Sequence, residues 1–63
     1  MNRQLKAAII VRFGDQDACA KALGVHKSHV SRLVHRRARP SEHDRLFFAR
    51  VFGERRARAL LSD

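Results

Sequence analysis

The side chains of this chain best suited to chemistry are polar and basic, and they gather between positions 25 and 39. This segment holds five Lys or Arg, three His and no acidic residue. A helical face exposed only to water usually mixes both signs of charge, so this bias indicates contact with an anion. The net charge of +8 and the pI near 11.6 indicate the same. Nucleic acid is the first candidate partner and an acidic membrane surface the second.

Helices are the elements predicted to position these side chains. Ala, Leu, Arg and Lys dominate the composition, and no alternating run of β-branched residues indicates a strand. Apolar spacing and end signals predict five helices, at about 3–13, 16–23, 27 to 35 or 36, 42–52 and, in ERRARALLSD, within 54–63. The predicted N-caps are Asn2, Asp15 and Ser41, with Asp44 completing a capping box, and the predicted stops are Gly14, Gly24 and Gly53.

Each predicted helix carries one apolar stripe for the core. In the first helix Val11 lies opposite the stripe and is expected to be exposed. The single cysteine, Cys19, has no partner for an internal disulfide, which fits a reducing compartment. The expected core residues are Leu5, Ile9, Ile10, Phe13, Cys19, Ala20, Leu23, Val25, Val30, Leu33, Val34, Phe48 and Phe52, with Phe47 or Val51. In the last helix, Ala57, Leu60 and Leu61 share one side.

The second and third predicted helices form a helix-turn-helix unit over residues 16–35. Ala20 is small, which lets the third helix cross closely over the second. Gly24 adopts the positive φ of the turn at low cost. Val30 and Leu33 then face inward, so the polar residues Lys27, Ser28, Ser31, Arg32 and His35 are left on the outer side.

The stretch FGDQDACAKALGVHKSHVSRLV resembles the helix-turn-helix of the Cro and phage-repressor group of DNA-binding proteins. The resemblance is close over this motif and extends more loosely over most of the chain. It implies an all-α, lambda-repressor-like bundle of four or five helices, with residues 1–63 as a single DNA-binding domain. It also implies transcriptional regulation by a homodimer.

Site residues follow from the resemblance and from the outward face of the third helix. Three positions depart from the family pattern: His26 replaces a Ser or Thr cap, Cys19 replaces an aliphatic residue, and no glycine follows the third helix. The expected base-reading residues are His26, Lys27, Ser28, Ser31 and Arg32; the expected phosphate contacts are Gln16, His35, Arg36, Arg37 and Arg39; and the structural signature is Ala20, Gly24, Val30 and Leu33.

The expected function is sequence-specific binding of double-stranded DNA, with the recognition helix at 27–36 in the major groove. A palindromic operator and a homodimer provide specificity that one small domain lacks. Repression is the simpler mode, because a small protein can act by blocking polymerase. No apolar run suits a signal peptide or a membrane span. The expected location is therefore the cytoplasm of a bacterial or phage-infected cell, associated with the nucleoid, with no cofactor or small-molecule ligand.

One alternative is an antitoxin or anti-repressor that acts through a protein partner, with DNA binding secondary. Its candidate contacts are the apolar residues Val11, Leu46, Leu60 and Leu61. Dimerisation explains the last two equally well. Solution mass, and loss of the dimer in Leu60→Asp, would separate these readings.

Other classes of function have weaker support in the sequence. Catalysis is not expected, because Ser28 and His29 are helix neighbours that point apart and a chain this short with five helices has little room for a pocket. A metal site is not expected either, since no CxxC occurs and Cys19 faces the core. RNA binding usually stacks bases on exposed aromatic rings, whereas the four Phe fit core positions.

Overall fold

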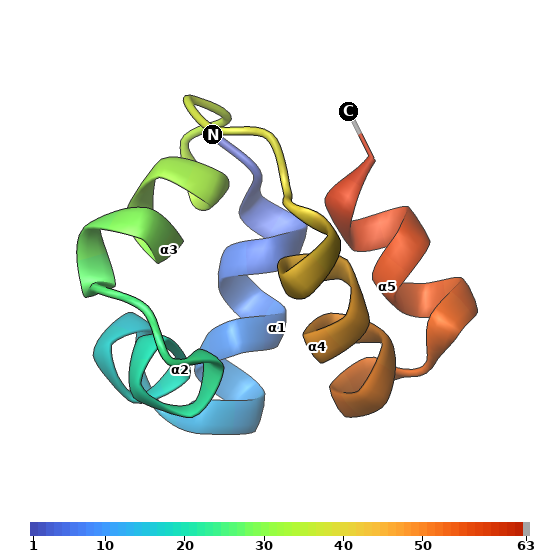
Figure 1. The fold of residues 1–63 in the computed structure, drawn as a ribbon, viewed down its shortest axis with the longest axis horizontal. Coiled ribbons are helices and arrows are strands. Elements are labelled where there is room, and N and C mark those ends of the chain that lie inside the picture. The colour runs from blue at the N-terminus through green and yellow to red at the C-terminus, as the bar shows by residue number, and fades with distance from the viewer. Residues whose placement is uncertain (63) are drawn as a thin grey trace.

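The computed structural model describes residues 1–62, and this range is all-helical. In Figure 1, α1 (Arg3–Phe13) runs through the middle, with α2 (Gln16–Leu23) and α3 (Lys27–Val34) on one side and α4 (Glu42–Phe52) and α5 (Glu54–Leu61) on the other. The predicted bounds of the first, second and fourth helices are confirmed, and Asp63 lies outside the described residues. No helix within 1–62 is long and apolar enough to cross a membrane.

Local end signals form as predicted. The side chain of Asn2 caps α1, that of Asp15 caps α2, and Gly24 ends α2 in the left-handed region with φ 84° and ψ 29°. At α4, the Asp44 amide donates to Ser41 Oγ at 3.1 Å, and the Ser41 amide donates back to Asp44 Oδ2 at 2.9 Å. These bonds satisfy donors that a helix start leaves without intrahelical partners, so each start is fixed by its neighbouring residues.

The third helix is shorter than predicted. It ends at Val34, and the expected continuation to His35 or Arg36 is wrong. Arg36 has a φ of +59°, which places it in the left-handed region that usually holds glycine. The Arg37 amide donates to the Arg32 carbonyl at 2.8 Å, and the Arg36 amide donates to the Leu33 carbonyl at 3.2 Å. The helix therefore closes with a Schellman motif in which arginine occupies the glycine position.

The core agrees with the predicted stripes at most positions. Ile10 is 44% exposed instead of widening the α1 stripe, and Phe13, Val25 and Phe52 are only half-buried. Leu60 is 6% exposed, so its reading as a surface contact is wrong; it packs inside the monomer. Val11 is exposed as expected. The buried set is Leu5, Ala8, Ile9, Cys19, Ala20, Leu23, Val30, Leu33, Val34, Phe48, Ala57 and Leu60.

Asn2 connects three helices at one end of the core. Asn2 caps α1 with its side chain. Its backbone N–H donates to the Val34 carbonyl at 2.6 Å, and its side-chain Nδ2 donates to the Leu60 carbonyl at 2.7 Å. The side chain is buried, so these hydrogen bonds compete little with water. The last turns of α3 and α5 are thereby held against the start of α1.

Candidate nucleic-acid interface

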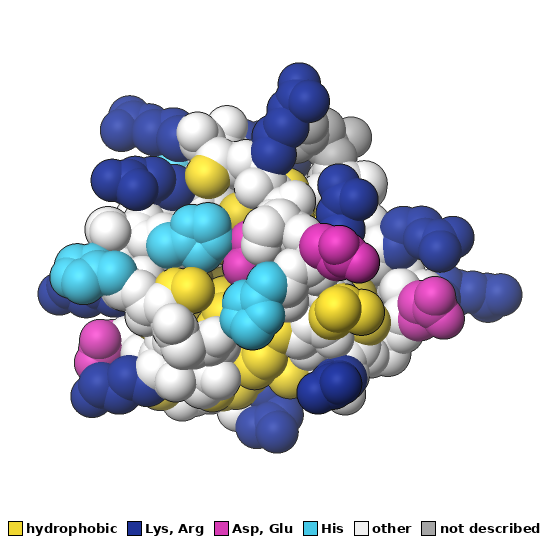
Figure 2. Space-filling model, in the orientation of Figure 1, with side chains coloured by type: hydrophobic (Ala, Val, Ile, Leu, Met, Phe, Trp, Pro, Cys, Tyr) yellow, Lys and Arg dark blue, Asp and Glu magenta, His cyan; other side chains and the backbone are white. Residues whose placement is uncertain are grey.

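The third helix has one buried face and one exposed face. Val30 and Val34 are fully buried and Leu33 nearly so, whereas Lys27 and Arg32 are exposed. Figure 2 shows Lys and Arg side chains along the upper left edge, over α3 and the loop that follows it. We call the outward set the α3 surface; it comprises His26, Lys27, Ser28, Ser31, Arg32 and His35.

The start of α3 is capped by histidine. The Ser28 amide donates to His26 Nδ1 at 3.1 Å, and the Ser28 hydroxyl lies 3.0 Å from the same nitrogen. A ring nitrogen that accepts carries no proton, so in this arrangement Nδ1 is the acceptor of the ring and Nε2 its donor. His26 therefore performs the capping role of the usual Ser or Thr. Its Nε2–H remains for an outside acceptor, while the Ser28 hydroxyl already has a local partner.

The remaining members of the α3 surface differ in exposure. Ser28 and Ser31 are half-buried, whereas Lys27, Arg32 and His35 are exposed. The long basic side chains therefore extend beyond the hydroxyl groups. The cationic side chains of Lys27 and Arg32 donate hydrogen bonds but accept none, which suits phosphate oxygens and guanine O6 and N7.

Three further cations lie in the loop after α3. Arg36, Arg37 and Arg39 are exposed, and the loop begins with the hydrogen-bonded turn described above. The Ala38 amide adds a second bond to the Arg32 carbonyl, at 3.3 Å. The backbone that carries these arginines is thus fixed at the end of α3, so their charge is continuous with that of the α3 surface.

Gln16, the expected phosphate contact outside this segment, is half-buried at the first position of α2. The Asp15 carboxylate occupies the same helix start, where its Oδ1 accepts from the Ala18 amide at 2.7 Å. This negative charge opposes a phosphate there, although the helix start itself favours one. Gln16 is therefore the member of the predicted set whose surroundings suit its role least.

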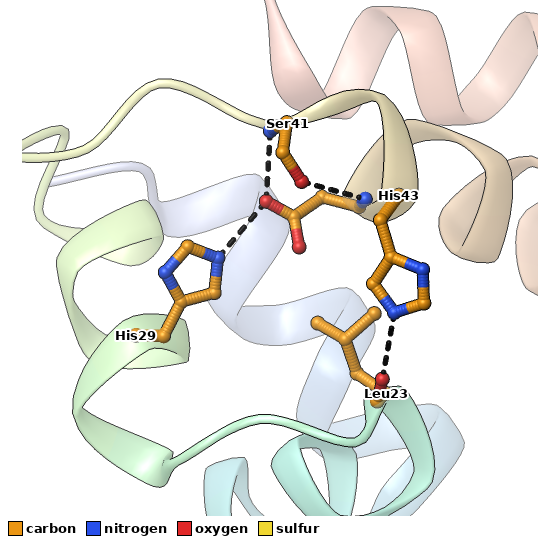
Figure 3. A network of polar contacts seen from close by, with 5 residues as sticks. Leu23, His29, Ser41 and His43 are labelled. Carbon is orange, nitrogen blue, oxygen red and sulfur yellow. Dashed lines mark hydrogen bonds and ion pairs between the residues drawn. The ribbon is translucent and has the colours of Figure 1, made fainter.

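A polar network lies between α3 and the start of α4, and sequence reasoning missed it (Figure 3). His29 Nε2 on α3 donates to Asp44 Oδ2 at 2.9 Å. His43 Nε2 on α4 donates to the Leu23 carbonyl at 3.0 Å, in the last turn of α2. The first turn of α4 is thus hydrogen-bonded to both α2 and α3, and these bonds help to fix the orientation of α3.

Asp44 is the centre of this network and is 1% exposed. Burial by itself raises the pKa of its carboxyl, but hydrogen bonds from Ser41 and His29 outweigh burial, and the pKa lies below its ordinary value of 3.8. Its Oδ1 is buried and makes no hydrogen bond within residues 1–62. The capping-box spacing indicated Asp44 as a cap; nothing local indicated His29, which is 15 residues away.

Cysteine and histidine side chains, the usual zinc ligands, do not converge in the described part of the chain. Cys19 is fully buried in the core, where burial raises the pKa of its thiol to about 11. His29 is engaged with Asp44 and His26 caps α3. Across the described chain, no three His, Cys, Asp or Glu side chains come together in a metal-binding group.

Comparison with known proteins gives no relative: no family model, no curated protein and no solved structure matches the chain. The functional conclusion therefore rests on the geometry of the α3 surface and the loop arginines.

Proposed function

We propose that this chain binds duplex DNA through the α3 surface, as a helix-turn-helix protein of the Cro and phage-repressor type. One observation carries the proposal: α3 buries its apolar face while its outer face and the following loop present exposed cations with no acidic residue from 25 to 39. Such a face on a helix that is otherwise fixed in a core suits a structured polyanion.

The dimensions of α3 support placement in the major groove. A helix of eight residues is about 12 Å long, and the major groove is about 12 Å wide. Lys27 and Arg32 are proposed to reach base edges, Arg32 by a bidentate contact to guanine. Ser28, Ser31 and the His26 Nε2–H act at shorter range. The proposed recognition helix is α3 itself, not the longer 27–36 segment expected from sequence.

The loop arginines are proposed to bind phosphates on one edge of the groove. With His35 and Gln16 they give five phosphate contacts, three of them by arginines, for which the log–log slope of affinity against salt is about −3. Such contacts position the protein on the duplex, while base contacts specify the sequence.

We further propose that the chain acts as a homodimer on a palindromic operator, as a small transcriptional repressor. One α3 spans only a few base pairs, so specificity requires two half-sites about one helical turn apart. Because Leu60 is buried, a dimer contact must use other apolar residues; Val11 on α1 is 86% exposed.

The decisive experiment is selection of bound duplexes from a random library, with wild type, Arg32→Ala and Arg55→Ala in parallel. Arg55 is exposed on α5, so its variant loses the same charge away from α3. We expect wild type to enrich a palindrome, Arg32→Ala to relax one symmetric position in each half, and Arg55→Ala to keep the wild-type preference. Loss of one bidentate base contact relaxes that position by about 1–3 kcal/mol.

Two results would contradict the proposal. Tight, salt-sensitive binding with no enriched sequence would reduce the α3 surface to a nonspecific clamp. Equal effects of the two alanine variants would show that net charge matters and the place of Arg32 does not.

A further inference from the structure

A second surface, on α4 and α5, is not used by the proposed DNA contact. A groove of about 440 Å³ runs between these two helices. Leu46 on its wall is 56% exposed, and alanines at its sides allow a third helix to approach closely. Figure 2 shows a hydrophobic area over α4, bordered by both basic and acidic side chains. The groove residues are Arg45, Leu46, Ala49, Glu54, Ala57, Arg58, Leu61 and Ser62.

The border of this groove carries excess positive charge. Arg45 and Arg58 line it, and Arg50, Arg55 and Arg56 are also exposed on the same two helices, where the exposed acidic residues are Glu42 and Glu54. Glu54 and Arg58 stand at the i,i+4 spacing that favours ion pairing. Arg36 aside, however, Lys21 on α2 is the only Lys or Arg within residues 1–62 whose side chain forms an ion pair with a carboxylate. The groove arginines are therefore available to an acidic partner.

Shape and charge together select the kind of occupant. A phosphate backbone neutralises arginines but offers no apolar group to cover Leu46. A second copy of the chain offers apolar groups, but it brings the same excess of arginine and a net charge of +8. A helix with an aliphatic stripe and carboxylates on both flanks satisfies both requirements, because its stripe covers the leucine while its flanks meet the arginines.

We propose that the α4–α5 groove binds an acidic amphipathic helix of a partner protein. The groove follows α5, which has eight residues and is about 12 Å long, so it receives about two turns of the partner. Aliphatic anchors at i and i+3 or i+4 lie along Leu46 and Leu61, and Asp or Glu flanks pair with Arg45 and Arg58. This inference does not depend on DNA binding by the α3 surface.

The test uses a synthetic helical peptide of about 18 residues, with a leucine stripe flanked by glutamates, and a matched peptide with glutamine at the flanks. Amide chemical shifts of the full chain are followed during titration, and affinity is measured by fluorescence anisotropy. We expect shifts confined to α4 and α5. Affinity should fall about tenfold for the glutamine peptide and for the double variant Arg45→Glu/Arg58→Glu. Leu46→Ser should weaken binding, and Arg32→Glu should leave it unchanged.

Several outcomes would overturn the inference. One is no binding at about 1 mM peptide, and another is equal affinity for both peptides. Shifts that map to α3 would show only attraction to the DNA-binding face. If a DNA duplex instead perturbs α4 and α5 as strongly as α3, these arginines form a second DNA surface. If Leu46→Ser dissociates a dimer that the peptide does not disrupt, the groove belongs to a second copy.

Discussion

Arg36 occupies a backbone position that costs stability and a surface position suited to phosphate. At its φ of +59°, a side chain with a Cβ costs roughly 1–2 kcal/mol relative to glycine. Glycine also increases the entropy of the unfolded chain, which lowers the stability of the glycine variant by about 0.4–1 kcal/mol and offsets part of this gain. We therefore compare Arg36→Gly with Arg36→Ala. Both lose the same guanidinium with all its contacts, so their difference isolates the backbone.

Thermal and urea denaturation followed by circular dichroism measure that difference. The free energy of unfolding of Arg36→Gly should exceed that of Arg36→Ala by about 0.5–1 kcal/mol, which corresponds to roughly 2–8 °C in Tm for a domain of this size. Both variants should bind DNA more weakly than wild type by similar amounts, with the salt slope reduced in magnitude by about 0.9. Stability and affinity then separate, because glycine improves only the first.

Two outcomes would contradict these expectations for position 36. Equal stability of the glycine and alanine variants would mean that position 36 is not held in the left-handed region. Wild-type affinity and salt slope in both variants would remove Arg36 from the phosphate contacts, even if the stability difference were found.

Three further predictions concern the core and its polar network. The pKa of Asp44 is lower in the folded chain than its ordinary value. The stability that the Asp44 carboxylate contributes is therefore fully present above about pH 4 and is lost as the pH falls through the folded pKa. Asp44→Asn should remove this acid dependence and lower the free energy of unfolding by about 1.5–3 kcal/mol, as measured by urea titration near neutral pH. Cys19, with a pKa of about 11 and no exposure, should be alkylated only as fast as the chain opens; a rate independent of added denaturant would contradict its burial. Leu60→Asp should unfold the chain, because it lowers the free energy of unfolding by more than about 4 kcal/mol. Leu46→Asp should change that free energy by no more than about 0.5 kcal/mol and leave Tm nearly unchanged. Similar melting of the two variants would refute the difference in burial.

Features that depend on a few neighbouring residues could be predicted from the sequence. Asn2, Asp15 and Ser41 cap helices because a side-chain oxygen reaches an amide three residues along the chain. Gly24 ends α2 because its left-handed conformation has no Cβ penalty. The outward direction of Lys27 and Arg32 also followed from local spacing, since helical periodicity places them away from the apolar stripe.

Other features depend on which helices pack together and could not be predicted from local spacing. Leu60 is buried because α5 packs against α1. Ile10 is exposed because the helices packed against α1 cover only part of its apolar face. His29 meets Asp44 across 15 residues, a distance over which no periodic signal acts. Arg36 accepts a left-handed backbone although the sequence offers no glycine, because the closed turn at the end of α3 requires one residue in that conformation.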